Sequence, residues 1–200
     1  MKAFHFTSSM HLPWILSVGE LRPSLNRIGD FPSPDLVWAT TDANGDRTAT
    51  ARTAHAAYRA GKMMLVRITF DASEFFSWSE VLDRFPQWTS RHVASLEHAA
   101  QTSGANPATW LCRSEALKLD RANAIDVRSF RNNVWRPVKS LEVRKPSNSS
   151  DWLVMEIDGK PYASQRTNGD KGAEAFTPGE LTVSFRDLSI VATPPAFRKS

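Results

Sequence analysis

One histidine near the amino terminus stands where its ring could serve chemistry. His5 lies between Phe4 and Phe6 and is followed by Thr7. In a strand these residues alternate, so that His5 and Thr7 point to one side and the two phenylalanines to the other. An imidazole in that position could hydrogen-bond a ligand hydroxyl through one ring nitrogen. The alternative is a structural histidine whose nitrogens are paired within the protein.

Two arginines could hold an anionic group of a ligand. Arg47 follows a turn that contains Gly45 and Asp46, and its planar guanidinium could clamp a phosphate or a carboxylate with two hydrogen bonds, or could simply be solvated. Arg67 lies in the middle of an apolar stretch. It therefore needs a partner, which would be either an acidic side chain or a ligand anion.

Two glutamates are candidates for a catalytic carboxylate. Glu174 lies in a loop rich in glycine, asparagine and aspartate over residues 166–179, and Glu180 falls where that loop enters an expected strand. A carboxylate at a strand start beside a loop could orient a hydroxyl or act as a base. Either residue is an ordinary surface glutamate unless His5 lies opposite it.

The segment 128–145 concentrates positive charge and interleaves it with aromatic rings. Cations that follow phosphates and rings that stack on bases are typical of surfaces that bind nucleic acid. A solvated sheet face is the alternative, because Asp126 and Glu142 dilute the charge. The basic and aromatic residues are Arg128, Phe130, Arg131, Trp135, Arg136, Lys139, Arg144 and Lys145, and of these we expect Arg128, Arg131, Trp135 and Arg136 to contact nucleic acid.

Several common kinds of site have no support in the sequence. The chain lacks a Gly-x-Ser-x-Gly nucleophile motif and the glycine-rich loops of P-loop and dinucleotide-binding proteins. His92 and His98 are six apart on one expected helix and face different sides, and no other group has metal-ligand spacing, so we expect no metal. Cys112 is the one cysteine, and its apolar neighbours predict a buried thiol.

The overall composition is that of a folded domain. Of the 200 residues 41% are hydrophobic, and the formal net charge of +4 is compatible with anionic partners. No window is long and apolar enough for a membrane helix, and the first residues do not resemble a signal peptide. We therefore expect a cytoplasmic protein without a membrane partner.

The pattern of apolar residues predicts a mixed α+β fold, mainly of antiparallel sheets, with a helical section in the middle. The first unit is a strand at 3–7, a helix at 10–18 capped by Ser8 or Ser9, and a stop at Gly19. Residues 20–34 hold three prolines and a glycine and are expected to be loop. Further strands are expected at 36–41, 63–70, 125–130, 141–144, 152–157, 160–164, 181–185 and 188–192, and helices at 48–60, 78–85 and 88–102. We predict one domain over residues 1–200, in which residues 151–200 add or complete a sheet.

The opening of the chain resembles that of DarT-like and related proteins with the ADP-ribosyltransferase fold. The similar residues are Phe4-His5-Phe6-Thr7, then His11-Leu12-Pro13-Trp14-Ile15-Leu16 and Gly19-Glu20-Leu21-Arg22-Pro23-Ser24. Residues 36–41 also resemble the second strand of uncharacterised bacterial proteins with the same opening. The similarity covers roughly the first fifth of the chain.

This resemblance implies particular roles for residues of the chain. In that fold the histidine of the first strand contacts the ribose of NAD, a glutamate at a later strand start orients a ribose hydroxyl, and an arginine after the second strand helps to hold the phosphates. The resemblance thus implies NAD as a substrate, bound by His5, Phe6, Thr7, Arg47 and Arg67. It implies catalytic roles for His5 and for Glu180 or Glu174.

Three functional hypotheses follow. The first is an enzyme that binds NAD and transfers ADP-ribose to a protein or nucleic acid, or hydrolyses NAD. The second is a non-catalytic module that binds nucleic acid or another partner through residues 128–145. The third is a small protein that uses the fold only to bind a partner.

Overall fold

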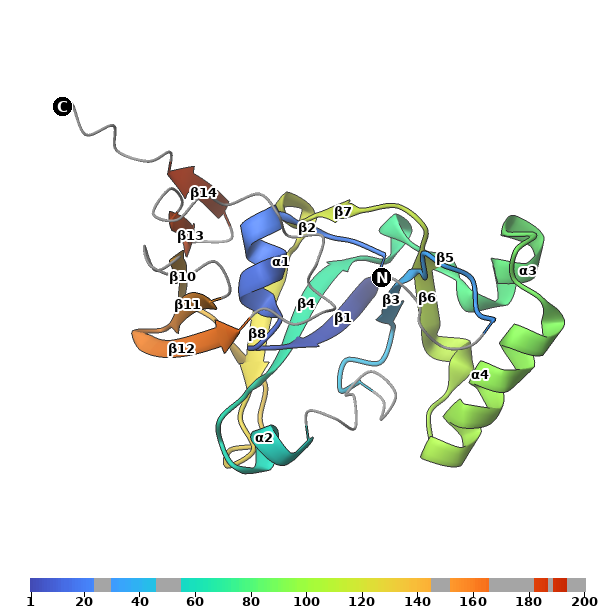
Figure 1. The fold of residues 1–200 in the computed structure, drawn as a ribbon, viewed down its shortest axis with the longest axis horizontal. Helices are drawn as coiled ribbons and strands as arrows, with labels where there is room; N and C mark the ends of the chain where they lie inside the picture. Colours follow the sequence, from blue (N-terminus) through green and yellow to red (C-terminus); the bar gives the residue numbers. More distant parts are fainter. Residues whose placement is uncertain (24–29, 46–54, 145–151, 166–181, 187–188, 194–200) are drawn as a thin grey trace.

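The computed structural model describes residues 1–23, 30–45, 55–144, 152–165, 182–186 and 189–193. It has the mixed α+β content that the sequence predicts, with antiparallel sheets and helices (Figure 1). Among the described residues no helix is long and apolar enough to cross a membrane.

The largest sheet has seven strands, and the amino-terminal strand lies at its centre. The strand order is β5-β6-β3-β1-β4-β8-β9, and every neighbouring pair is antiparallel. The strands are β1 (Lys2–Ser8), β3 (Val37–Thr40), β4 (Leu65–Asp71), β5 (Phe76–Ser77), β6 (Trp110–Arg113), β8 (Ala124–Arg128) and β9 (Arg136–Pro137). The expected strands at 3–7, 36–41, 63–70 and 125–130 are confirmed, whereas β5, β6 and β9 were not predicted.

A second antiparallel sheet has five strands in the order β12-β11-β10-β13-β14. It consists of β10 (Ser140–Arg144), β11 (Trp152–Ile157), β12 (Lys160–Gln165), β13 (Thr182–Arg186) and β14 (Ser189–Thr193). It therefore begins at residue 140 rather than 151. A third pair, β2 (Glu20–Leu21) with β7 (Leu117–Lys118), lies partly in the segment expected to be loop.

The helices are α1 (Leu12–Val18), α2 (His55–Arg59), α3 (Val81–Arg84) and α4 (Ser90–Ser103), with 3-10 turns η2 (Ala72–Glu74), η3 (Trp78–Glu80), η4 (Pro107–Thr109) and η5 (Leu119–Arg121). The long helix α4 ends at Gly104, as predicted. The segment 78–85 is a 3-10 turn followed by α3 rather than one helix. Of the helix expected at 48–60, residues 55–59 are described and helical.

The prediction that Ser8 or Ser9 caps α1 is wrong. The residue at the N-cap is His11, and its side chain makes no capping hydrogen bond. Ser9 is used elsewhere, because its amide donates to the Met64 carbonyl and its hydroxyl accepts from the Met64 amide. These bonds tie the end of β1 to the start of β4. Gly19 ends the helix in the left-handed conformation, as expected.

The two faces of the seven-stranded sheet carry different cores. One face packs against α1 and the second sheet, and its buried cluster joins Leu12 and Leu16 of α1 to Ile68 of β4 and to Leu141 and Met155 of the second sheet. Figure 1 shows α1 between the two sheets. We call this face the α1 face.

The opposite face carries the tryptophans at one end and α2 at the other. Trp38, Trp78, Trp88 and Trp110 contact one another in edge-on and tilted geometries where α3 and α4 cover strands β3 and β6. Cys112 belongs to this cluster and is fully buried, as predicted. We call this side of the sheet the α2 face.

Candidate functional site

His5 lies on the α1 face at the centre of the large sheet. Its cross-strand partner on β4 is Ile68, which belongs to the core beneath α1. The ladder between β1 and β3 consists of the Phe4–Thr40 pair, so that the two strands are joined at one point. One residue further along β1, the side chain of His5 makes a second link to β3, because its Nδ1 lies 2.8 Å from the main-chain oxygen of Trp38.

The hydrogen bond to Trp38 determines how the His5 ring is protonated. A carbonyl oxygen can only accept, so Nδ1 carries the proton and Nε2 is the acceptor of the neutral ring. Burial lowers the pKa of His5, and the bond to the Trp38 carbonyl opposes this shift without reversing it. The ring is therefore neutral at physiological pH. Among the described residues Nε2 makes no hydrogen bond, so it can accept one from a ligand hydroxyl.

The predicted NAD-contacting residues do not share one face. Thr7 lies on the same face as His5 because two residues separate them in β1. Phe6 is opposite Arg67 in the β1–β4 register, and both lie on the α2 face. Thr7 can therefore act together with His5, whereas Phe6 and Arg67 lie on the other side of the sheet.

Arg67 has an acidic partner within the protein. Its Nε and Nη2 donate to Oδ2 of Asp126, its cross-strand neighbour on β8, at 3.2 and 2.9 Å. Its third nitrogen, Nη1, donates to the carbonyl oxygen of Ala43. Of the two partners considered from the sequence, the structure shows the acidic side chain.

The remaining residues of the predicted NAD site cannot be placed. Glu174, Glu180 and Arg47 lie outside the described residues. Tyr58 is not on the His5 side, since it packs on the α2 face with Leu65. The described part of the site is therefore His5 with Thr7, on the α1 face of strand β1, which lies between β3 and β4.

The basic segment is divided between residues with partners and residues without them. Arg136 is paired with Asp158, which also accepts hydrogen bonds from the Lys139 and Ser140 amides. Burial acts to raise the pKa of Asp158, but these hydrogen bonds lower it overall. Arg131 is exposed and has no ion pair among the described residues, and the side chain of Arg144 and the whole of Lys145 are not described.

Trp135 is the centre of a stack on the α2 face. The guanidinium carbon of Arg67 lies 4.8 Å from the centre of its ring system, and that of Arg128 lies 4.7 Å from it. The Phe6 ring is 5.6 Å away. Guanidinium groups over an indole face are favourable cation–π pairs. Of the four residues expected to contact nucleic acid, Arg128 and Trp135 are thus in contact with each other.

Sequence reasoning missed residues that complete this face. Tyr58 of α2 contacts the ring of Phe130 at 5.6 Å, edge to face, and shares a buried cluster with Leu65 and Trp135. The one signal in the sequence was the aromatic residue at 58 in an otherwise alanine-rich segment. It gave no indication of the partner, which lies more than seventy residues further along the chain.

The part of the chain that the structure describes holds no group of three or more side chains able to bind a metal ion. Comparisons of the chain with protein-family models, with curated proteins and with solved structures found no match.

Proposed function

We propose that this protein binds NAD and cleaves its nicotinamide–ribose bond, transferring ADP-ribose to a protein or nucleic acid, or to water. The observation that carries the proposal is the fixed orientation of His5. Its Nδ1 is bound to the Trp38 carbonyl, which leaves Nε2 as an acceptor for a ribose hydroxyl. The resemblance of residues 4–24 to the opening of ADP-ribosyltransferase-fold proteins supports the same role.

The chemistry requires a histidine that positions the ribose and stays neutral, rather than one that gains or loses a proton. When the bond between the ribose C1′ and the nicotinamide nitrogen breaks, its electron pair leaves with nicotinamide and positive charge develops on the ribose. The acceptor oxygen or nitrogen then bonds to C1′ and loses a proton. A neutral imidazole that holds a ribose hydroxyl restricts the pose without adding positive charge beside the developing cation. The lowered pKa of His5 suits this role.

A carboxylate is needed to stabilise the ribose cation, and we assign it to Glu180, with Glu174 as the alternative. Arg47 is proposed to hold the phosphates. Arg67 is not, because each of its three nitrogens already donates a hydrogen bond to Asp126 or Ala43 and it lies on the opposite face. We also propose a cytoplasmic location, because a single cysteine allows no internal disulfide and is compatible with a reducing compartment.

The test uses two substitutions that separate the nitrogens of His5. Asparagine places an amide nitrogen near the position of Nδ1, so His5→Asn can keep the bond to Trp38 while it removes Nε2. Glutamine places its amide near the position of Nε2, so His5→Gln loses the hydrogen bond to the Trp38 carbonyl. His98→Ala is the control, because that histidine is exposed on α4.

Each variant is incubated with NAD labelled in the adenylate moiety, alone and with cell extract, and the release of nicotinamide is measured. We expect His5→Asn to lose at least about tenfold of the activity with its stability retained, by analogy with losing one positioning hydrogen bond. Glu180→Gln should lose more, and His98→Ala should be unchanged. Absence of nicotinamide release and of label transfer by the wild type under all conditions would refute the proposal. Loss with Glu174→Gln but not with Glu180→Gln would reassign the carboxylate.

A further inference from the structure

The arginines of this protein differ in whether they are paired. Arg22, Arg67, Arg84, Arg91, Arg113, Arg121 and Arg136 each lie within reach of a carboxylate. Among the other arginines whose side chains the structure describes, none forms an ion pair, and these are Arg59, Arg128 and Arg131. Unpaired cations are common on surfaces, so their location decides whether they matter.

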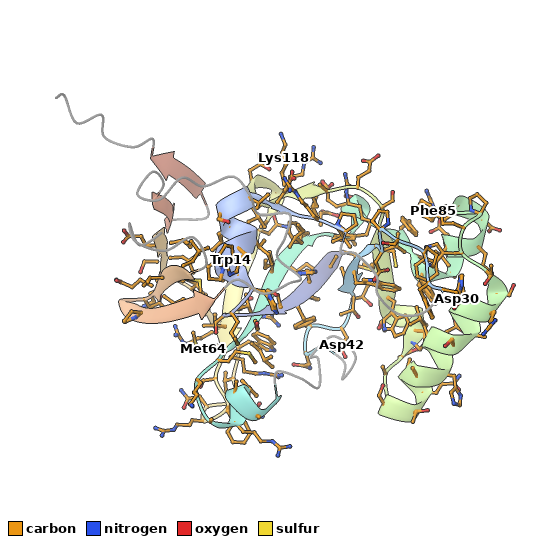
Figure 2. The ribbon with its side chains drawn as sticks, viewed as in Figure 1. Trp14, Asp30, Asp42, Met64, Phe85 and Lys118 are labelled. Carbon is orange, nitrogen blue, oxygen red and sulfur yellow. The ribbon has the colours of Figure 1, made fainter. Side chains whose placement is uncertain are left out.

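The unpaired arginines belong to one corner of the α2 face. Arg59 follows Tyr58 at the end of α2, and Arg131 follows Phe130 in the connection from β8 to β9, and these two rings are in contact. Arg128 is the cross-strand partner of Leu65, which packs with Tyr58. Figure 1 shows α2 beside the end of the β8–β9 hairpin, and Figure 2 shows long side chains tipped with nitrogen around α2.

We define the cationic corner by the residues Arg59, Lys62, Arg128, Phe130 and Arg131. Lys62 is exposed and also without an ion pair in the described part of the chain. The acidic side chain two residues before Arg128 in β8, that of Asp126, is already engaged by Arg67. The corner therefore carries a surplus of positive charge that nothing in its described surroundings neutralises.

Buried polar atoms at this corner also lack partners. Nε of Arg128, Nε1 of Trp135 and the hydroxyl of Tyr58 are all buried without a hydrogen bond. Tyr58 is only 8% exposed. A buried donor without a partner costs free energy in the folded protein, so the described residues leave the interior beneath this corner incompletely paired.

An exposed apolar surface adjoins the cations. Phe130 is 47% exposed although it contacts Tyr58, and Val134 in the same connection is 65% exposed. The edge-on contact with Tyr58 holds the Phe130 ring in place while part of it faces solvent. A fixed and exposed ring among cations is a platform on which a base can stack.

We propose that the cationic corner binds single-stranded nucleic acid, with the arginines on successive phosphates and a base on Phe130. A duplex would satisfy the cations equally well but hides the faces of its bases, and so would leave Phe130 without a partner. The site lies on the face opposite His5. It is therefore a docking surface for a strand and makes no use of the proposed NAD chemistry.

The experiment measures the anisotropy of a labelled single strand of roughly twelve nucleotides, as oligo-dT or oligo-rU, over a range of salt concentrations. The test variants are Arg59→Gln/Arg131→Gln and Phe130→Leu. The matched control is Arg91→Gln/Lys118→Gln, which removes the same charge at exposed positions elsewhere, and Figure 2 labels Lys118 at the far side from α2. A hairpin duplex and anionic vesicles serve as competing ligands.

We expect the arginine pair to weaken binding at least about tenfold and to reduce the slope of log K against log salt by about 1.4, since each phosphate contact on a single strand contributes about 0.7. Phe130→Leu should weaken binding at least about fivefold with the slope unchanged, because stacking carries no charge. The control should stay within about twofold. His5→Asn should bind the strand normally, which separates this proposal from that of NAD chemistry.

Four results would overturn the proposal. They are no binding by the wild type at low salt, equal affinity for the hairpin duplex, an equal loss in the control variant, or binding to anionic vesicles alone. The second would indicate a site for phosphates without stacking. The third would indicate attraction by net charge only.

Discussion

The ion pair between Arg67 and Asp126 gives a quantitative prediction. The two side chains face each other across β4 and β8, with exposed fractions of 15% and 13%. Both hydrogen bonds from the guanidinium end on Oδ2 of Asp126. The substitution Asp126→Asn keeps the shape of the side chain and removes its charge, which leaves the guanidinium with the Ala43 carbonyl and two aromatic rings.

The expected cost lies between two limits. Breaking a fully buried pair costs about 3–5 kcal/mol, and an exposed pair is worth about 0–1 kcal/mol. Low exposure places Arg67 nearer the first limit. The asparagine oxygen can still accept one bond, and the rings still shelter the cation, so we expect a loss of about 2 kcal/mol. In a domain of this size that lowers the melting temperature by about 4–8 °C.

The assay is urea unfolding followed by tryptophan fluorescence, which gives the free energy of unfolding and its dependence on urea. Glu80→Gln is the matched control, because Glu80 is paired with Arg84 and the two side chains are 43% and 50% exposed. We expect that variant to lose much less stability than Asp126→Asn, because an exposed ion pair is screened by solvent. If Asp126→Asn loses no more than the control, the pair is solvated in solution and the assignment of Arg67 to the fold is refuted.

Three further predictions concern single residues. The His5 ring should titrate below its usual pKa of 6.5 and carry its proton on Nδ1, which nitrogen NMR detects. The free energy of unfolding should fall as the pH drops through about 6.5, because the unfolded chain takes up the proton before the folded chain does. Urea unfolding should show that Gly45→Ala lowers the free energy of unfolding by about 2 kcal/mol and Gly19→Ala by about 1 kcal/mol. Both glycines have positive φ, but a Cβ at Gly45 would lie 2.9 Å from the Phe6 ring, whereas a Cβ at Gly19 would meet open space. Cys112 should not react with a thiol reagent at pH 8 until the protein unfolds, because burial raises the pKa of its thiol.

Local signals in the sequence account for the elements that were predicted correctly. Asp158 and Gly159 both have positive φ, as a two-residue hairpin turn requires, and the hairpin β11–β12 follows from that turn. Gly19 and Gly104 end α1 and α4 for a similar reason, since glycine adopts the left-handed conformation without strain. Each of these signals acts within a few residues, and so it can be recognised from the sequence alone.

The elements that escaped prediction depend on partners far away in the chain. Strand β6 is a short apolar run without alternation, and it becomes a strand by pairing with residues 37–40, some seventy positions earlier. The two-residue strands β2 and β7 form only with each other. The cap of α1 was misjudged because Ser9 is bound by Met64, a contact across 55 positions.

The candidate sites depend even more strongly on partners that are distant in the chain. The sequence identified His5 and Arg67 as residues in need of partners, and in each case the structure supplies one, Trp38 or Asp126, from a neighbouring strand. Neither partner could be predicted, because the register of a sheet is set by the packing of whole strands. The side of the sheet on which each residue lies was readable from alternation along β1 and β4 once the strands were known.

Alternation along β1 makes the two proposals separable. His5 and Phe6 are neighbours in the chain, yet one lies on the α1 face and the other lies beside Trp135 on the α2 face. A substitution on the α1 face, such as His5→Asn, tests the NAD proposal, and one at Phe130 tests the nucleic-acid proposal, because the β-sheet separates the two sites.

If both prove correct, a nucleic-acid strand held on the α2 face would have to pass around an edge of the sheet to reach the ribose. An acceptor on that same strand therefore requires several nucleotides beyond those that Arg59, Arg128 and Arg131 hold, so ADP-ribosylation of a bound strand should depend on its length, whereas binding should not once the corner is filled.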